Sequence, residues 1–463
     1  MSVVFHSTRG LAPETDIRGV ALAGLAPDGG LYLPKTWPRF SPDGIAAMRG
    51  APYQDIAFHV LRPFFDGAIA DDDLEHIVEK TYAAFDVPEV TPLRALGGEL
   101  HILELFHGPT LAFKDVALQF LGHMFDHFLR ASGKQITIIG ATSGDTGSAA
   151  IAALAGRANI DLFILYPDKG PSEIQRKQMT CVEAGNVHAI AVQGSFDDCQ
   201  AIVKAMFADA ALRDELSLTT VNSINLLRIL AQIVYYFVAA SHFDAPPSFV
   251  VPTGNFGDIY AGYAAAQCGL PVAKLAVASN SNDILTRFFA TGRMEAGAVQ
   301  GTLSPSMDIQ VSSNFERLLF DLCGRDAALV RALMGEMKGK GSFAVSAPQF
   351  AQAQKIFAAA CADDEETLAT IADVYGKCDY MIDPHTAVGV KVARDLAATL
   401  TQPVICLATA HPAKFPDTVR KATGRTPVLP ENTAALIGKP ERTVLLPADR
   451  RAITDFVRKN GAA

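Results

Sequence analysis

Short runs of β-prone apolar residues alternate with Ala-rich amphipathic segments through most of the chain. ITIIGAT is followed by GSAAIAALAG, LFILYPD by SEIQRKQMTCVEAG, and AIAVQG by FDDCQAIVKAMFADAAL. Further along, SFVVPTG precedes DIYAGYAAAQCG, and the runs KLAVASN and PVICLATA come later. Strands that alternate with helices in this way favour an α/β fold, with open and largely parallel sheets covered by helices.

The texture of the sequence changes near residue 95, and we expect three domains along the chain. Residues 1–95 are rich in Pro and Gly turns and mixed helices, which predicts a small N-terminal α+β domain. The alternating pattern that follows is divided into a smaller domain at 96–215 and a larger one at 216–463. Residues 295–375 are more helical and charged, so we expect a helical insertion or covering layer there.

Composition narrows the classes of protein. The chain has 463 residues, of which 49% are hydrophobic and 19% charged, as expected of a globular protein with more than one domain. Its net charge of −9 argues against a nucleic-acid partner, and no apolar run is long enough for a membrane span. The N-terminus has no pattern of a secretory signal. The seven cysteines form no CxxC pair, which favours reduced thiols in the cytoplasm.

A Gly-rich loop follows the first predicted strand of the alternating region. In GATSGDTGSAA (140–150), Gly144 and Gly147 allow tight turns, while Ser143, Asp145 and Thr146 place polar groups at a helix start. This pattern is typical of a well-capped helix and also of an anion cradle made of backbone N–H groups. The spacing fits neither a Walker A loop nor a dinucleotide fingerprint.

Two other strand ends carry candidate chemistry. The segment VVPTGNFGDIYAGYAAA contains Gly254, Asn255, Phe256, Gly257 and Asp258 just before a predicted helix. Close glycines leave amide groups free to approach a phosphate, although a turn with a helix cap is the other interpretation. In VICLATAHPAKF, Thr409 follows a buried strand, and its hydroxyl could serve either as a core group or as a partner of a ring nitrogen.

A lone lysine and a histidine pair complete the candidates. Lys114 lies among Leu111, Phe113 and Val116, and desolvation of this kind lowers the pKa of a lysine toward the neutral, nucleophilic form. His123 and His127 lie four residues apart, but Met124 occupies the place of the zincin glutamate and no third ligand is evident. We therefore expect no metal site. Lys114 and the three loops together suit a ligand with an aldehyde, a phosphate and a ring nitrogen, which describes pyridoxal phosphate.

Several motifs in this chain closely resemble the threonine synthase family. They are HGPTLAFKD, ATSGDTG, TGNFGD, NSINLLRILAQ and DPHTAVG, with FHSTRG and GLAPDGGLYLP near the start, as in the longer form of that enzyme. The resemblance spans nearly the whole chain. It implies a pyridoxal-phosphate enzyme of the tryptophan-synthase-β fold group, fold type II, with the cofactor between the two sheet domains.

The resemblance also implies roles for the site residues. Lys114 would form the Schiff base with the cofactor, the loop from Gly254 to Asp258 would hold its phosphate, and Thr409 would face its pyridine nitrogen. The substrate carboxylate would lie at Ser143, Gly144, Asp145, Thr146 and Gly147. The substrate phosphate would be held by Ser223, Asn225 and Arg228.

The implied reaction converts O-phospho-L-homoserine and water to L-threonine and phosphate, the last step of threonine biosynthesis. A phospho-lyase that releases 2-oxobutyrate from the same substrate is the nearest alternative. A non-catalytic binding protein of the same fold is the alternative from another class. The oligomeric state, monomer or homodimer, stays open.

Overall fold

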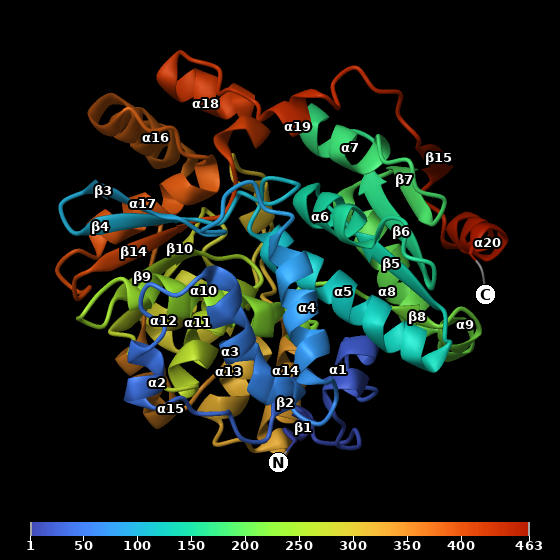
Figure 1. Ribbon diagram of the computed structural model, residues 1–463, viewed down its shortest axis with the longest axis horizontal. Coiled ribbons are helices and arrows are strands. Elements are labelled where there is room, and N and C mark those ends of the chain that lie inside the picture. The colour runs from blue at the N-terminus through green and yellow to red at the C-terminus, as the bar shows by residue number, and fades with distance from the viewer. Residues whose placement is uncertain (1, 462–463) are drawn as a thin grey trace.

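The computed structural model describes residues 2–461 and contains two open sheets covered by helices (Figure 1). The five-stranded sheet has the order β15–β7–β6–β5–β8 and is parallel throughout. Its strands are β5 (Ile136–Ala141), β6 (Ile160–Pro167), β7 (Val187–Gln193), β8 (Leu218–Thr219) and β15 (Val444–Pro447). Strands such as ITIIGA are buried along almost their whole length, because helices cover both faces of a parallel sheet. The predicted α/β fold is confirmed.

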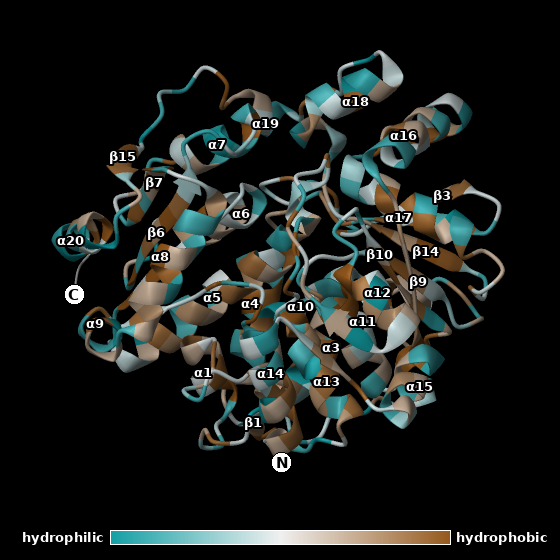
Figure 2. Ribbon diagram, turned by 180° about the vertical axis from the view of Figure 1, so that it is seen from behind, coloured by the Kyte–Doolittle hydropathy of each residue, from teal (hydrophilic) through white to brown (hydrophobic). Residues whose placement is uncertain are grey.

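The six-stranded sheet has the order β13–β10–β9–β14–β4–β3. Its strands are β3 (Leu93–Gly97), β4 (Leu100–Glu104), β9 (Ser248–Pro252), β10 (Lys274–Ser279), β13 (Phe357–Cys361) and β14 (Val404–Ala408). Only the β3–β4 pair is antiparallel. Figure 2 shows hydrophobic residues concentrated in the central strands β6, β9 and β14, whereas peripheral helices carry more hydrophilic positions.

The N-terminal part is a mixed α+β unit. Its two-stranded antiparallel sheet and its helices are β1 (Phe5–Ser7), β2 (Tyr32–Pro34), α1 (Ile17–Ala23), α2 (Pro42–Ala46), α3 (Tyr53–Phe65) and α4 (Asp71–Tyr82). Helices α1, α3 and α4 pack against two long buried helices, α5 (Lys114–Ser132) and α10 (Leu226–Ser241). Every residue of α10 but the last is buried, so this helix lies in the main hydrophobic core.

The remaining helices cover the two sheets. Those nearest the five-stranded sheet are α6 (Asp145–Leu154), α7 (Glu173–Thr180), α8 (Phe196–Ala208), α9 (Ala210–Glu215) and α20 (Arg450–Asn460). Those nearest the six-stranded sheet are α11 (Gly257–Gln267), α12 (Ile284–Thr291), α16 (Asp364–Cys378), α17 (Pro384–Asp395) and α18 (Pro416–Thr423). The short turns η2 (Pro412–Lys414) and α19 (Glu431–Ala434) come near the C-terminal end of the chain.

Three strands do not follow the predicted domain boundaries. Strand β4 lies within 96–215, yet it pairs with β14 in the six-stranded sheet. Strands β8 and β15 lie within 216–463, yet they pair with β5 and β7 in the five-stranded sheet, and α20 packs on α8 beside β15. A boundary drawn along the sequence misses such crossings, because strand pairing joins segments far apart in the chain.

Residues 295–375 form mostly a helical layer, which also contributes the edge strand β13 of the six-stranded sheet. The elements are β11 (Arg293–Glu295), η1 (Pro305–Met307), α13 (Phe315–Leu322), α14 (Ala327–Lys340), β12 (Ser342–Ala344) and α15 (Ala347–Ile356), followed by β13 and α16. Strands β11 and β12 form an antiparallel pair. Among the helices of residues 2–461, none is long and apolar enough to cross a membrane.

Candidate active site

A tight turn places Lys114 at the start of α5. The amide and hydroxyl of Thr110 donate hydrogen bonds of 2.8 and 2.7 Å to the Asp115 carboxylate, and Leu111 adopts a left-handed φ of 61°. A Cβ added to Gly108 would lie 2.4 Å from the Cβ of Asp115, so this turn needs a glycine. The Phe113 amide donates to the Thr409 carbonyl at 2.9 Å, which fixes the turn to the end of β14.

The amine of Lys114 is enclosed and lies between the two sheets. The residue is 8% exposed, and its Nζ lies 3.3 Å from Oδ2 of Asp145, the first residue of α6 after β5. Burial lowers the pKa of Lys114, the charges of Lys414 and Arg228 lower it further, and the Asp145 carboxylate opposes them. The contact therefore joins the carboxyl ends of strands from both sheets, where parallel sheets usually carry their sites.

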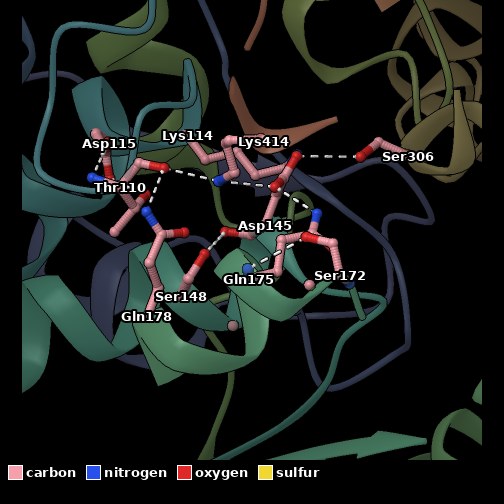
Figure 3. A network of polar contacts seen from close by, with 12 residues as sticks. Thr110, Lys114, Asp115, Asp145, Ser148, Ser172, Gln175, Gln178, Ser306 and Lys414 are labelled. Carbon is pink, nitrogen blue, oxygen red and sulfur yellow. Dashed lines mark hydrogen bonds and ion pairs between the residues drawn. The ribbon is translucent and has the colours of Figure 1, made fainter. Parts of the chain in front are cut away.

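Asp145 is the centre of the polar network in Figure 3. The Nζ of Lys414, which is fully buried, lies 2.8 Å from Asp145 Oδ1 and donates to the Thr110 carbonyl at 2.7 Å. Gln175 Nε2 donates to Oδ1 at 2.8 Å, and the Ser306 hydroxyl donates to Oδ2 at 3.3 Å. Burial alone would raise the pKa of Asp145, but Lys414 and Lys114 hold it well below its usual value.

Sequence reasoning missed Lys414, Gln175 and Ser306. Lys414 lies in the segment VICLATAHPAKF, in which only Thr409 was a candidate. Lys414 and Asp145 are 269 positions apart in the sequence and meet only in the folded chain. The sequence around either residue therefore gives no sign of this contact. Gln175 belongs to a helix-capping box with Ser172, and such boxes are common at helix starts.

The loop between β5 and α6 is built around Thr142. Its Oγ1 accepts hydrogen bonds of 2.9 Å from the amides of both Gly144 and Gly147. Gly144 precedes the helix with φ 148° and gives it no side-chain cap. Ser143 and Thr146 are half-buried, and their hydroxyls have no hydrogen-bond partner in residues 2–461. Because the Gly144 and Gly147 amides are engaged by Thr142, the groups left for an anion at the start of α6 are the first amides of the helix and the Ser143 and Thr146 hydroxyls.

The loop between β9 and α11 has the same character. Phe256 precedes α11 with a left-handed φ of 61° and gives it no side-chain cap, while its ring packs against Phe315 at 5.4 Å between centroids. Asp258 turns its carboxylate away into the core, where Tyr235 and Tyr236 donate to it. Burial raises the pKa of Asp258 to about 6 against the opposing effect of those two hydroxyls.

Arg228 is a buried cation without a carboxylate partner. It is 3% exposed, its Nη1 donates to the Val221 carbonyl at 3.1 Å, and its Nε has no partner. No ion pair to Arg228 is present in residues 2–461, and burial lowers its pKa to about 10. Asn225 caps α10 through Oδ1 and donates from Nδ2 to the Ala21 carbonyl, so both ends of its amide are in use. Ser223 is half-buried in the same turn.

The remaining candidates lie as follows. Thr409 is 6% exposed at the end of β14, and its hydroxyl has no hydrogen-bond partner among the described residues. His123 is buried enough that its pKa falls to about 4. Across residues 2–461 no three His, Cys, Asp or Glu side chains gather in a group that could hold a metal ion.

Comparisons with known proteins cover nearly the whole chain. Family models match at residues 4–82 (threonine synthase N terminus), 85–409 (pyridoxal-phosphate dependent enzyme) and 386–457 (threonine synthase, C-terminal). A threonine synthase of Pseudomonas aeruginosa is 50% identical over 99% of this chain and 98% of its own length.

Solved structures agree with the sequence matches. The structure of a pyridoxal-phosphate-bound threonine synthase from Brucella melitensis is 49% identical, covers 100% of both chains and superposes with a TM-score of 0.97. A yeast threonine synthase is 41% identical, with a TM-score of 0.93 over 99% of this chain and 98% of that one.

Proposed function

The chain belongs to the threonine synthase family of pyridoxal-phosphate dependent enzymes, and on that premise we propose how its own residues convert O-phospho-L-homoserine and water to L-threonine and phosphate. The observation that carries the proposal is the buried amine of Lys114 beside Asp145, with the unpaired cation Arg228 close enough to lower its pKa.

The residues of the site fit the cofactor on three counts. The Lys114 amine is buried with a lowered pKa, which favours the neutral form that bonds an aldehyde. The amides at the start of α11 have no side-chain cap, so they are open to a phosphate. The Thr409 hydroxyl lacks a partner and can serve a ring nitrogen. Pyridoxal phosphate, when bound, supplies a conjugated ring that withdraws electrons from the substrate's α-carbon.

We propose that Lys114 Nζ holds the cofactor as a Schiff base, and that the backbone of Gly254, Asn255, Phe256 and Gly257 holds its phosphate. Asp258 contributes its amide, because its carboxylate is engaged by tyrosines in the core. A carboxylate aimed at the phosphate would repel it. The hydrogen bonds from Tyr235 and Tyr236 instead hold Oδ1 of Asp258 in the core.

The substrate needs two anion sites, one for each end. Its carboxylate would lie at the start of α6, among Ser143, Gly144, Thr146 and Gly147, with Asp145 directed instead at the two lysines. Its phosphate would lie against Arg228 and Ser223. Arg228 offers an unpaired Nε and a planar fork for phosphate oxygens, and Asn225 fixes the turn that carries both.

Proton transfer falls to Lys114. Its free Nζ would lie close to Asp145 Oδ2, which would hold it oriented. Lys414 already neutralises much of the charge on Asp145, so Lys114 can give and take a proton without leaving an unpaired buried carboxylate.

A phospho-lyase is the second candidate, because the same groups would bind the same substrate and release phosphate. The identity of more than 40% to threonine synthases over nearly full length favours the synthase. A non-catalytic binding protein is disfavoured because Lys114 and the α11 loop are both intact.

We also propose a cytoplasmic protein that binds no nucleic acid and works as a monomer or homodimer. All seven cysteines are free, which suits a reducing compartment.

The deciding experiment follows phosphate and threonine together after O-phospho-L-homoserine is added to the holoenzyme. Equal amounts of both are expected, and Lys114→Ala should yield neither. Phosphate with 2-oxobutyrate would assign a lyase. Neither product from protein that visibly binds the cofactor would overturn the proposed substrate.

A further inference from the structure

One fully buried arginine in the helical layer contacts three separate parts of the site's surroundings. Arg317 lies in α13 and is 0% exposed. Its Nη2 donates at 2.6 Å to the carbonyl of Ile224, which lies between Ser223 and Asn225. Its Nε donates at 3.2 Å to the Tyr32 carbonyl in the N-terminal unit. The third contact is from Nη1 to Oδ1 of Asn314.

Asn314 carries the connection to the second loop. Its backbone amide and its Nδ2 both donate to the Asn255 carbonyl, each at 3.0 Å. The neighbouring Ser312 hydroxyl donates to the Gly254 carbonyl at 2.8 Å. The carbonyls of Gly254 and Asn255 are thus turned toward the segment before α13, so the amides that follow them in the same trans peptide groups point away from that segment.

A buried guanidinium is costly unless all its donors are used. Arg317 makes no ion pair in the described part of the chain, so it is held by neutral oxygens from three segments. Burial lowers its pKa to about 10, so it remains charged at neutral pH. A planar fork that reaches three acceptors at fixed angles sets distances between the segments, which an apolar residue of the same volume would not do.

We propose that Arg317, through Asn314, is a positioning residue that fixes the turn for the substrate phosphate and the loop for the cofactor phosphate relative to each other. The inference rests on the proposed function for the identity of the two phosphates. It gives residues 295–375 a role in the site: this layer sets the spacing of two anion sites that come from different strands. Arg317 itself touches neither ligand.

Arg325 provides a matched control in the same layer. Its Nη1 donates to the carbonyls of Pro34 and Lys35, and its Nε donates to Asp321. It therefore ties the helical layer to the N-terminal unit as Arg317 does, but it contacts neither anion loop. Loss of either arginine should lower the melting temperature, whereas only loss of Arg317 should change ligand binding.

The test compares Arg317→Met, Arg317→Lys and Arg325→Met with the wild-type protein. Three quantities are measured: KM against kcat for O-phospho-L-homoserine, the dissociation constant of pyridoxal phosphate by equilibrium dialysis, and the melting temperature. We expect Arg317→Met to raise both KM and the cofactor constant about ten-fold or more, as for a lost charge-assisted hydrogen bond. Arg317→Lys should fall between, and Arg325→Met should leave both constants within about two-fold.

The outcomes separate this inference from the proposed function. If the wild-type protein makes no threonine, the proposed function fails, and the cofactor constant still tests Arg317. Equal ligand constants for Arg317→Met and Arg325→Met, with equally lowered melting temperatures, would reduce Arg317 to a structural role and overturn the inference. Should Arg317→Met not fold, Arg317→Lys decides by the same two constants.

Discussion

At the scale of single residues, the site depends on how two lysines share one carboxylate. Lys414 and Lys114 both contact Asp145, and the charge of Lys414 is one reason that the pKa of Lys114 is lowered. In Lys414→Met, Lys114 would be the one lysine paired with Asp145, and the repulsion from the Lys414 charge would be gone. The pKa of Lys114 should therefore rise. Because the neutral amine is the reactive form, cofactor uptake should then need a higher pH than in the wild-type protein.

The measurement is the rate of absorbance change as the apoprotein takes up pyridoxal phosphate, recorded from neutral to alkaline pH. The half-maximal pH should move upward, and slow uptake at neutral pH should recover at alkaline pH. Lys391→Met is the control, since Lys391 pairs with Asp395 and Glu366 away from the site. A profile unchanged or moved to lower pH would contradict the role given to Lys414.

Arg228 leads to a prediction of opposite sign for binding and stability. Its charge is buried and has no ion-pair partner, so it should cost stability in the ligand-free protein. Arg228→Met should raise KM for O-phospho-L-homoserine about ten- to hundred-fold, the loss expected for one charge-assisted contact to phosphate. The same change should leave the melting temperature of the ligand-free protein equal or higher. Arg130→Met, at an exposed position, should alter neither KM nor the melting temperature. An unchanged KM in Arg228→Met would show that Arg228 does not bind the substrate phosphate.

Sequence reasoning identified these residues unevenly, for a physical reason. Lys114 and Arg228 lie inside motifs, so they could be named before the fold was known. Lys414 and Arg317 act through contacts to segments far along the chain, and nothing local distinguishes them from any other buried cation. Burial of a charge is a property of the folded molecule, so a single sequence does not report it.

At the scale of elements, the start of α6 depends on one glycine. Gly144 has φ 148°, and a Cβ there would lie 2.4 Å from the side chain of Gln175, which donates to Asp145. Gly144→Ala should therefore displace Gln175 and disturb the presentation of Asp145, in addition to straining the backbone. We expect kcat/KM to fall at least ten-fold. Steady-state kinetics with O-phospho-L-homoserine measures it.

Gly156→Ala is the matched control for Gly144. Gly156 also has a positive φ, 75°, and it follows the end of the same helix, but a Cβ there would meet no atom within 4 Å. This variant should lose stability through backbone strain alone and keep its kcat/KM. If both variants lose activity in proportion to their loss of stability, the contact with Gln175 is not what matters.

Strand and helix order was the part of the fold most readable from sequence. Strands such as β5 and β9 are buried on both faces, so their unbroken apolar runs predict parallel strands followed by helices. Edge strands lack that signal. β15 is mostly exposed, and only its pairing with β7 makes it a strand of the smaller sheet. This is why the boundary drawn at residue 216 left the C-terminal segment with the larger sheet.

At the scale of the whole molecule, the C-terminal segment supplies the edge strand β15 of the five-stranded sheet and the helix α20 that packs beside it. Ile453 and Val457 of α20 are fully buried in a cluster with Phe163 and Ile190 of that sheet. Two ion pairs, Arg458 with Glu215 and Arg450 with Asp209, are exposed and therefore add little. The attachment of α20 is thus mainly hydrophobic, and its loss should loosen the smaller sheet more than the larger one.

Ile453→Ala tests this attachment. Removal of a buried isoleucine side chain typically costs about 2 to 5 kcal/mol, because a cavity remains where the side chain was. Amide hydrogen exchange should therefore quicken in β15, β7 and α8, while β9 and β14 in the other sheet keep the wild-type rate. The exposed Ile437 provides the control, since Ile437→Ala should change exchange in neither sheet. Faster exchange spread evenly over both sheets would mean that the sheets open together, and the C-terminal segment would then stabilise the molecule as one unit.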